Sequence, residues 1–221
     1  MARVEATSPA VALRKLRLGD SWSYSVAGSL ASPDGGTLPL TGEIEVSIVP
    51  DELPGRAVQM AIQFSQNFEV LQPDGARKAL PAPTWMFSIV QDPDSADVAI
   101  AADNMGPGGA RRTAKAPQVF YPGRWSRNTA YGNQLDFDNG DYVKNTLAVV
   151  DEEWVETARG KFLAWKSSVT SESVAMGRID GVDWWTPELG APVRFSTDAG
   201  MPDGSGIRFL ATLSDSNVLT G

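Results

Sequence analysis

Apolar and polar residues alternate with a period of two along most of the chain. Residues 21–26 read Ser-Trp-Ser-Tyr-Ser-Val, with every second residue apolar. Because successive side chains of a strand point to opposite faces, this pattern is typical of a strand with one buried face. Similar patterns predict further strands over residues 38–48, 58–64, 68–72, 85–90, 98–102, 119–125, 134–138, 141–150, 153–157, 162–173, 182–186, 191–195 and 207–213.

Short turn sequences separate several of these runs. Asp34-Gly35-Gly36, Pro73-Asp74-Gly75 and Asn139-Gly140 combine residues that set or tolerate turn dihedral angles. Strands joined by such short links pair antiparallel. If the Asn139-Gly140 loop has two residues, Asp138 lies opposite Asp141.

No long segment has apolar residues at the spacing of an amphipathic helix, so we expect little helix. We expect an all-β protein of about ten or more strands with little helix, in which a strongly curved antiparallel sheet forms a half-barrel, barrel or sandwich. Residues 1–221 read as a single β-rich domain. The alternative is an organisation in two halves, separated by a Gly-rich and basic loop near residues 104–117.

The composition removes most catalytic chemistry. The 221 residues include no His and no Cys, which excludes Ser-His-Asp and Cys-His catalysis, disulfides and the usual zinc sites. The sequence also lacks G-x-S-x-G and G-x-G-x-x-G motifs. We therefore predict a non-enzymatic protein without a cofactor. A carboxylate enzyme would need two acids converging in a cleft, and the sequence shows no such pair.

The charge balance and the lack of long apolar runs limit the partners and the location. The net charge of −8 argues against nucleic acid as a partner. No run reaches the roughly 18 apolar residues of a membrane span, so no transmembrane segment is expected. Residues 1–18 lack a signal-peptide pattern, so either export is absent or a signal has been removed from this chain. The absence of cysteine favours a periplasmic or other extracytoplasmic location.

Basic and acidic residues are segregated in neighbouring segments. Arg111, Arg112 and Lys115 lie in a stretch without acids, whereas residues 136–156 hold seven acids and one Lys. The basic side chains could contact an acidic partner, lipid head groups or a membrane surface. The alternative, which we prefer, is that they neutralise the acidic strands of the same chain.

Three of those acids form a weak candidate metal site. Alternation and pairing place Asp136, Asp138 and Asp141 on one face of the expected hairpin, where a cation would relieve their repulsion. An EF-hand pattern fails, because its fifth position would be Gly140 and its twelfth Leu147. We therefore predict a solvated acidic hairpin and no metal.

Aromatic residues gather in the last third of the chain. Trp184 and Trp185 are consecutive, so in a strand they face opposite sides and one of them belongs to a second buried surface. That surface would be a ligand cavity, an edge covered by a loop, or a protein interface. The predicted ligand- or partner-binding residues are Trp22, Tyr24, Trp165, Trp184 and Trp185, with core packing as the alternative.

Two late motifs and one early motif resemble a class of known proteins. Residues 160–166 read Gly-Lys-Phe-Leu-Ala-Trp-Lys, residues 184–190 read Trp-Trp-Thr-Pro-Glu-Leu-Gly, and residues 16–24 contain Gly-Asp-Ser-Trp-Ser-Tyr. These motifs resemble uncharacterised bacterial exported β-rich proteins, which are similar to lipoprotein-carrier and lipocalin-like folds. The resemblance implies a curved, half-closed sheet and no catalytic residues. This chain lacks the lipid-acceptor Cys of a lipoprotein.

These observations predict a non-enzymatic, extracytoplasmic binding or accessory module that holds an apolar ligand or a protein partner on a curved sheet. The alternative is a structural or accessory subunit that stabilises a larger, membrane-associated complex. In that case Arg111, Arg112 and Lys115 would lie near an acidic partner or head groups.

Overall fold

The computed structural model describes residues 10–51, 60–81, 83–105, 107–174, 177–200 and 204–220. These residues form strands and two short 3₁₀ helices. The first strands are β1 (Val11–Ala12), β2 (Ser21–Ala31), β3 (Thr37–Pro50), β4 (Met60–Leu71), β5 (Arg77–Leu80), β6 (Trp85–Gln91), β7 (Val98–Asp103) and β8 (Arg112–Tyr121). The later elements are β9 (Arg124–Trp125), β10 (Ala130–Asp136), β11 (Tyr142–Thr157), β12 (Gly160–Ser173), β13 (Gly177–Thr186), β14 (Ala191–Gly200), β15 (Gly206–Ser216), η1 (Pro107–Gly109) and η2 (Asn217–Thr220).

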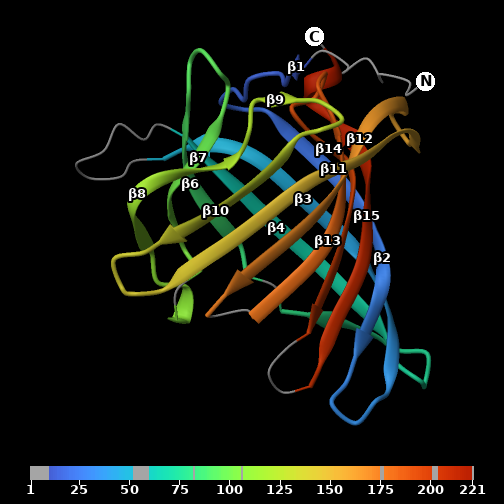
Figure 1. Cartoon of the computed structure of the whole chain (residues 1–221). Helices are drawn as coiled ribbons and strands as arrows, with labels where there is room; N and C mark the ends of the chain where they lie inside the picture. The colour runs from blue at the N-terminus through green and yellow to red at the C-terminus, as the bar shows by residue number, and fades with distance from the viewer. Residues whose placement is uncertain are drawn as a thin grey trace, which may run out of the picture.

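One curved antiparallel sheet runs through both halves of the chain (Figure 1). Its strand order is β10-β11-β12-β13-β14-β15-β2-β3-β4-β6-β7-β8, and β5 pairs with β4 beside this path. The short strands β1 and β9 form a separate pair. The prediction of an all-β fold with a strongly curved sheet is therefore confirmed.

The two ends of this path, β8 and β10, nearly close the sheet into a barrel. A single bridge joins Ala114 to Phe137 across the seam. The amide of Asp138 donates to the carbonyl oxygen of Thr113 at 2.9 Å. The hydroxyl of Tyr131 donates to the carbonyl oxygen of Val119 at 2.5 Å. At this seam, hydrogen bonds from side chains thus replace many of the backbone–backbone hydrogen bonds of a regular strand pair.

Arg112 crosses the seam as a buried cation. Its guanidinium donates two hydrogen bonds of 2.8 Å to the carboxylate of Asp103 on β7 and one of 3.2 Å to Asp141. It also lies 4.2 Å from the ring centroid of Phe137. The expected loop near residues 104–117 therefore ends at Arg111, because β8 begins at Arg112: Arg112 and Thr113 pair with β7, and Ala114 bridges to Phe137 just after β10.

The three predicted turns join β2 to β3, β4 to β5 and β10 to β11. Gly140 has φ +89°, a conformation that favours glycine. The register of this last hairpin differs from a two-residue loop, because Asp136 pairs with Tyr142 and Phe137 donates its amide to Asp141. The loop is longer, and Asp138 does not lie opposite Asp141.

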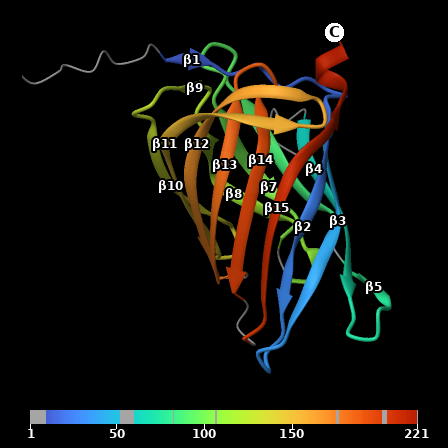
Figure 2. The ribbon, with the colours of Figure 1, turned by 90° about the vertical axis from the view of Figure 1, so that its right-hand side faces the viewer.

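Residues 10–20 lie across the end of the barrel that is uppermost in Figure 2. The amide of Leu13 donates to Gly123 at 2.8 Å and that of Arg14 to Pro187 at 2.9 Å, which ties this segment to the β8–β9 and β13–β14 loops. Leu13 and Leu16 are buried. The β2–β3 hairpin projects at the opposite end (Figures 1 and 2). Within the described ranges, no helix has the length and apolar character needed to cross a membrane.

Candidate functional site

The inner face of the barrel encloses a cavity of about 470 Å³. Its walls come from β2, β3 and β4 on one side, from β13, β14 and β15 on the other, and from β6 and β8. Aliphatic and aromatic side chains make up most of the lining. Apart from Tyr and Trp, the polar side chains among the described lining residues are Gln66, Asp183 and Thr197. The volume falls in the range of roughly 300–1,000 Å³ that is typical of small-molecule sites.

Aromatic rings form the part of the cavity wall nearest the covered end. Tyr121 and Trp185 contact each other with ring centroids 4.9 Å apart, and Trp125 packs 5.3 Å from Trp185. On the neighbouring strands, the Tyr24 and Phe195 rings meet edge to face at 5.1 Å. These contacts hold the rings in fixed positions around the inner end of the cavity.

Asp183 is the one carboxyl group among the described residues that line the cavity. It lies on β13, two residues before Trp185 and opposite Phe195 of β14. The residue keeps some accessible surface, but the carboxyl is removed from bulk water, and this desolvation raises its pKa to about 7. The nearby indole N–H of Trp185 favours the ionised carboxylate and so partly offsets this increase in the pKa. Nε1 nevertheless forms no hydrogen bond of ordinary geometry in the structure.

Two indole donors in the cavity wall have no partner. Nε1 of Trp22 and Nε1 of Trp185 are both buried without a hydrogen-bond acceptor. An unsatisfied buried donor costs about 1–3 kcal/mol, so each indole would be stabilised by an acceptor placed beside it. Tyr24 differs, because its hydroxyl donates to the carbonyl oxygen of Pro192 at 2.8 Å. Burial raises the pKa of Tyr24 and of Tyr121, so both phenols are neutral at physiological pH.

The five aromatic residues predicted as a site occupy three different places. Trp22, Tyr24 and Trp185 line the cavity. Trp165 does not line it, since its ring stacks against Trp125 at 6.2 Å behind the wall. Trp184 faces the outside of the barrel, where the cations of Lys166 and Arg194 lie 5.3 and 5.8 Å from its ring centroid.

Trp184 thus supplies the second buried surface expected from the consecutive tryptophans. Its Nε1 donates to the carboxylate of Glu153, so its polar edge is also satisfied within the chain. The long charged side chains of Lys166 and Arg194 lie against this ring on the outer face.

The predicted basic contact residues are also divided. Arg112 is 2% exposed and paired with two carboxylates, so it is not presented to a partner or head group. Arg111 forms an ion pair of 2.7 Å with Asp51. Lys115 is exposed on β8. The Arg112–Asp141 contact is the intramolecular match between basic and acidic segments that the sequence analysis preferred.

The weak candidate metal site does not assemble. Asp141 is held by Arg112, Asp138 accepts from the amide of Thr113 at 3.3 Å, and Asp136 accepts from Gln134 at 2.7 Å. The part of the chain that the structure describes contains no group of three or more acids placed to hold a metal ion. The longer hairpin loop explains the difference, because it separates carboxylates that a two-residue loop would bring together.

The polar centre of the cavity was not predicted from the sequence. Asp183 and Trp185 are two residues apart, so strand alternation alone places this acid on an apolar face. That signal was available in the pattern. Tyr121, Phe195 and Phe209 also line the cavity, but their convergence depends on the pairing order of distant strands.

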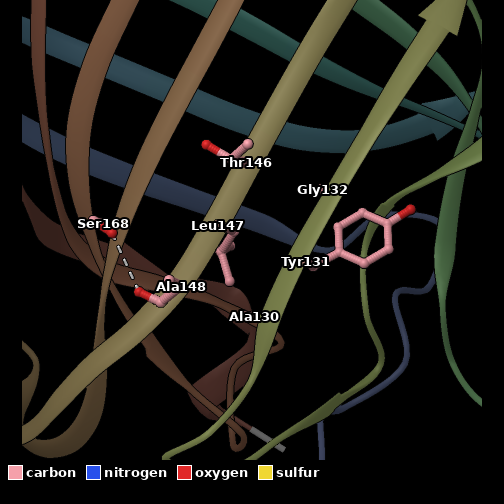
Figure 3. A pocket seen from close by; sticks show the side chains of 7 residues that line it. All are labelled: Ala130, Tyr131, Gly132, Thr146, Leu147, Ala148 and Ser168. Carbon is pink, nitrogen blue, oxygen red and sulfur yellow. Dashed lines mark hydrogen bonds between the residues drawn. The ribbon is translucent and has the colours of Figure 1, made fainter.

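A second hollow of about 400 Å³ lies on the outside of β10, β11 and β12 (Figure 3). It is lined by small side chains together with Tyr131, Leu147 and Ser168. The hydroxyls of Tyr131 and Ser168 already donate to backbone carbonyl groups of the sheet. No charged side chain lines this hollow, so it offers a ligand little beyond shape.

Neither a family model nor a curated protein matches the chain. Among solved structures, it is similar to a Bacteroides fragilis protein described as exported and as having a YmcC-like fold, with 12% identity and a TM-score of 0.36. It is also similar to a Parabacteroides distasonis protein described as a lipoprotein, with 10% identity and a TM-score of 0.34. Each match covers 95% of this chain and 100% of the other. These descriptions agree with the exported class that the sequence motifs resemble, but at such scores the likeness carries no function to this chain.

Proposed function

We propose that this protein is an extracytoplasmic binding module that holds a small apolar molecule inside its barrel. The observation that carries the proposal is the cavity of about 470 Å³ with its largely apolar lining. In barrels of about eight strands, side chains fill the interior or leave room for one small ligand. This sheet curves through twelve strands, so its side chains are not expected to fill the enclosed space.

The chemistry of the wall favours an apolar ligand over water. Most of the lining is aliphatic or aromatic, so water inside the cavity would find few hydrogen-bond partners. A ligand with an alkyl chain would instead exchange exposed apolar surface for contact with these walls. The single carboxyl in the lining also supports a binding role, because a carboxylate enzyme would need a second acid converging with Asp183.

Fluorescence quenching provides a direct test, because two tryptophans line the cavity. A long-chain alcohol that carries a bromine on the carbon next to its hydroxyl-bearing carbon is titrated into the protein, so that the bromine lies at the polar end of the ligand. Heavy-atom contact in the cavity is expected to quench Trp22 and Trp185, with saturation at one ligand per chain. The exposed Trp154 on β11 provides the matched control, since Trp154→Phe should leave the quenched component intact whereas Trp185→Phe should reduce it.

A pair of substitutions on β15 checks the location of the ligand. Ile207 lines the cavity, and the adjacent Arg208 is exposed on the outer face. Ile207→Phe should narrow the cavity and weaken binding, whereas Arg208→Phe should not. Absence of saturable quenching, together with native mass spectra that show no bound alcohol, would overturn the proposal. Equal weakening by both substitutions would place the ligand outside the barrel.

A further inference from the structure

We infer that the ligand is a single-chain amphiphile whose polar end is a primary ammonium group, bound by the carboxyl of Asp183 among the rings of Tyr24, Tyr121 and Trp185. This inference rests on the proposed function, since it concerns the same cavity. It adds the chemical class of the ligand's polar end and the position at which that end lies.

The first support is the isolation of the carboxyl group. Asp183 is the single acid in the described lining, and no Lys or Arg lines the cavity with it. The nearest cations on the flanking strands, Lys166 and Arg194, lie on the outer face against Trp184. A buried carboxylate without a cation is unfavourable, so an ammonium group from the ligand would supply the missing partner.

The second support is the ring arrangement around this carboxyl. Phe195 lies opposite Asp183 in the strand register, and its ring contacts Tyr24 at 5.1 Å. Trp185 lies on the same face of β13 and contacts Tyr121 at 4.9 Å. Aromatic rings attract cations through their faces, so the rings near this carboxyl add to its attraction for an ammonium group.

The third support is the unpartnered indole of Trp185. Its Nε1 is buried and has no acceptor in the structure. When an ammonium group binds and keeps Asp183 ionised, one carboxylate oxygen can accept from the ammonium and the other from this indole. Both polar groups are then satisfied by one ligand.

The same arrangement disfavours a fatty acid anion. Its carboxylate would face Asp183 with no cation in the described lining to separate the two charges. A long-chain alcohol would still bury its chain, but it would lack the charge-assisted contact. The cavity should therefore rank three ligands of equal chain length in the order amine, alcohol, carboxylate.

The experiment compares dodecylamine, dodecanol and dodecanoate, each below its critical micelle concentration, by displacement of the brominated alcohol. At about pH 8.5, where Asp183 is ionised, we expect the amine to bind roughly tenfold or more tightly than the alcohol. At about pH 5.5 this preference should shrink, because the carboxyl is protonated while the amine stays charged. Tyr24 and Tyr121, the other titratable groups of the lining, remain neutral throughout.

Asp183→Asn and Asp180→Asn form the matched pair of variants. Asp180 is exposed on the outer face of the same strand, so its substitution should leave the amine preference unchanged. Asp183→Asn should abolish both the preference and its pH dependence while the alcohol still binds. Equal affinities for amine and alcohol in the unaltered protein, or a preference that survives Asp183→Asn, would overturn the inference but not the binding function. Failure of all three ligands to bind would overturn the binding function itself.

Discussion

Replacing Asp183 by Asn should stabilise the ligand-free protein at neutral and alkaline pH. The pKa of this carboxyl is raised to about 7 by desolvation, whereas an Asp in an unfolded chain titrates near 3.9. Between these two values the folded protein retains a proton that the unfolded chain has released. The free energy of unfolding therefore falls as the pH rises through this window, and stays level above it.

The raised pKa sets the expected size of the effect. A shift of about three pKa units corresponds to roughly 4 kcal/mol, because each unit is worth about 1.4 kcal/mol. Asp183 keeps part of its surface open to the cavity, and water there would relieve some of the desolvation. We therefore expect Asp183→Asn to raise the unfolding free energy by about 2–4 kcal/mol at alkaline pH. At about pH 4 the two proteins should be nearly equal in stability.

Urea unfolding at several pH values between about 4 and 8.5 measures this difference. Asp34, Asp92, Asp141 and Asp180 have lowered pKa values, so acid weakens the protein through them with the opposite sign. Their contribution is common to both proteins and cancels when the two curves are subtracted. A difference that does not change with pH, or a variant less stable than the unaltered protein at pH 8, would refute the reasoning.

Three further substitutions test the packing around the cavity, each by urea or thermal unfolding. Arg112→Ala should cost about 3–5 kcal/mol, because it leaves a buried carboxylate unpaired. Arg208→Ala, whose ion pair with Asp198 is exposed on both sides, should cost at most about 1 kcal/mol, and equal losses would contradict the buried pair. Tyr24→Phe should cost about 0.5–1.5 kcal/mol through the lost hydrogen bond to Pro192, and no loss would mean that this bond is not formed. Gly42→Ala should cost about 1–3 kcal/mol, since a Cβ there would lie 2.1 Å from the Asn67 carbonyl oxygen. In the control Gly132→Ala, the atoms nearest the new Cβ lie 3.6 Å away, so stability should change by less than about 0.5 kcal/mol.

Local sequence patterns, namely alternation and turn residues, predicted most of the strands and their short connections. Alternation over residues 21–26 predicted the inward face of β2, and the turn residues predicted the β2–β3, β4–β5 and β10–β11 connections. The start of β8 was missed, because its Pro117 and the preceding glycines are typical of a loop. Proline is tolerated near a sheet edge, and the seam between β8 and β10 is such a place.

Closure of the barrel could not be predicted, because it depends on contacts between distant residues. The seam is joined by the Ala114–Phe137 bridge and by the contact of Arg112 with Asp141, while Asp103 of β7 holds Arg112 from its own side of the seam. Each of these groups is unremarkable within its own strand. Charge segregation indicated that basic and acidic segments would meet, but it could not identify which arginine would be buried.

On β13 and β14 the inward side chains become smaller with distance from the covered end of the barrel. On β13 the inward positions run from Trp185 through Asp183 and Gly181 to Ile179 as the strand is followed away from the covered end. On β14 they run from Phe195 through Thr197 to Ala199. On these two strands small residues leave space beyond the rings, whereas Phe68 on β4 and Phe209 on β15 also line the cavity farther from the covered end.

This decrease in side-chain size orients the proposed ligand. Asp183 lines the cavity beside Trp185 on β13, so a polar group at this level meets both the carboxyl and the indole of Trp185. Ile179 and Ala199 line the cavity farther from the covered end, so an alkyl chain attached to this polar group can extend toward them. The polar end of the ligand is therefore expected to be the deeply buried end, and its chain to lead toward the β2–β3 hairpin.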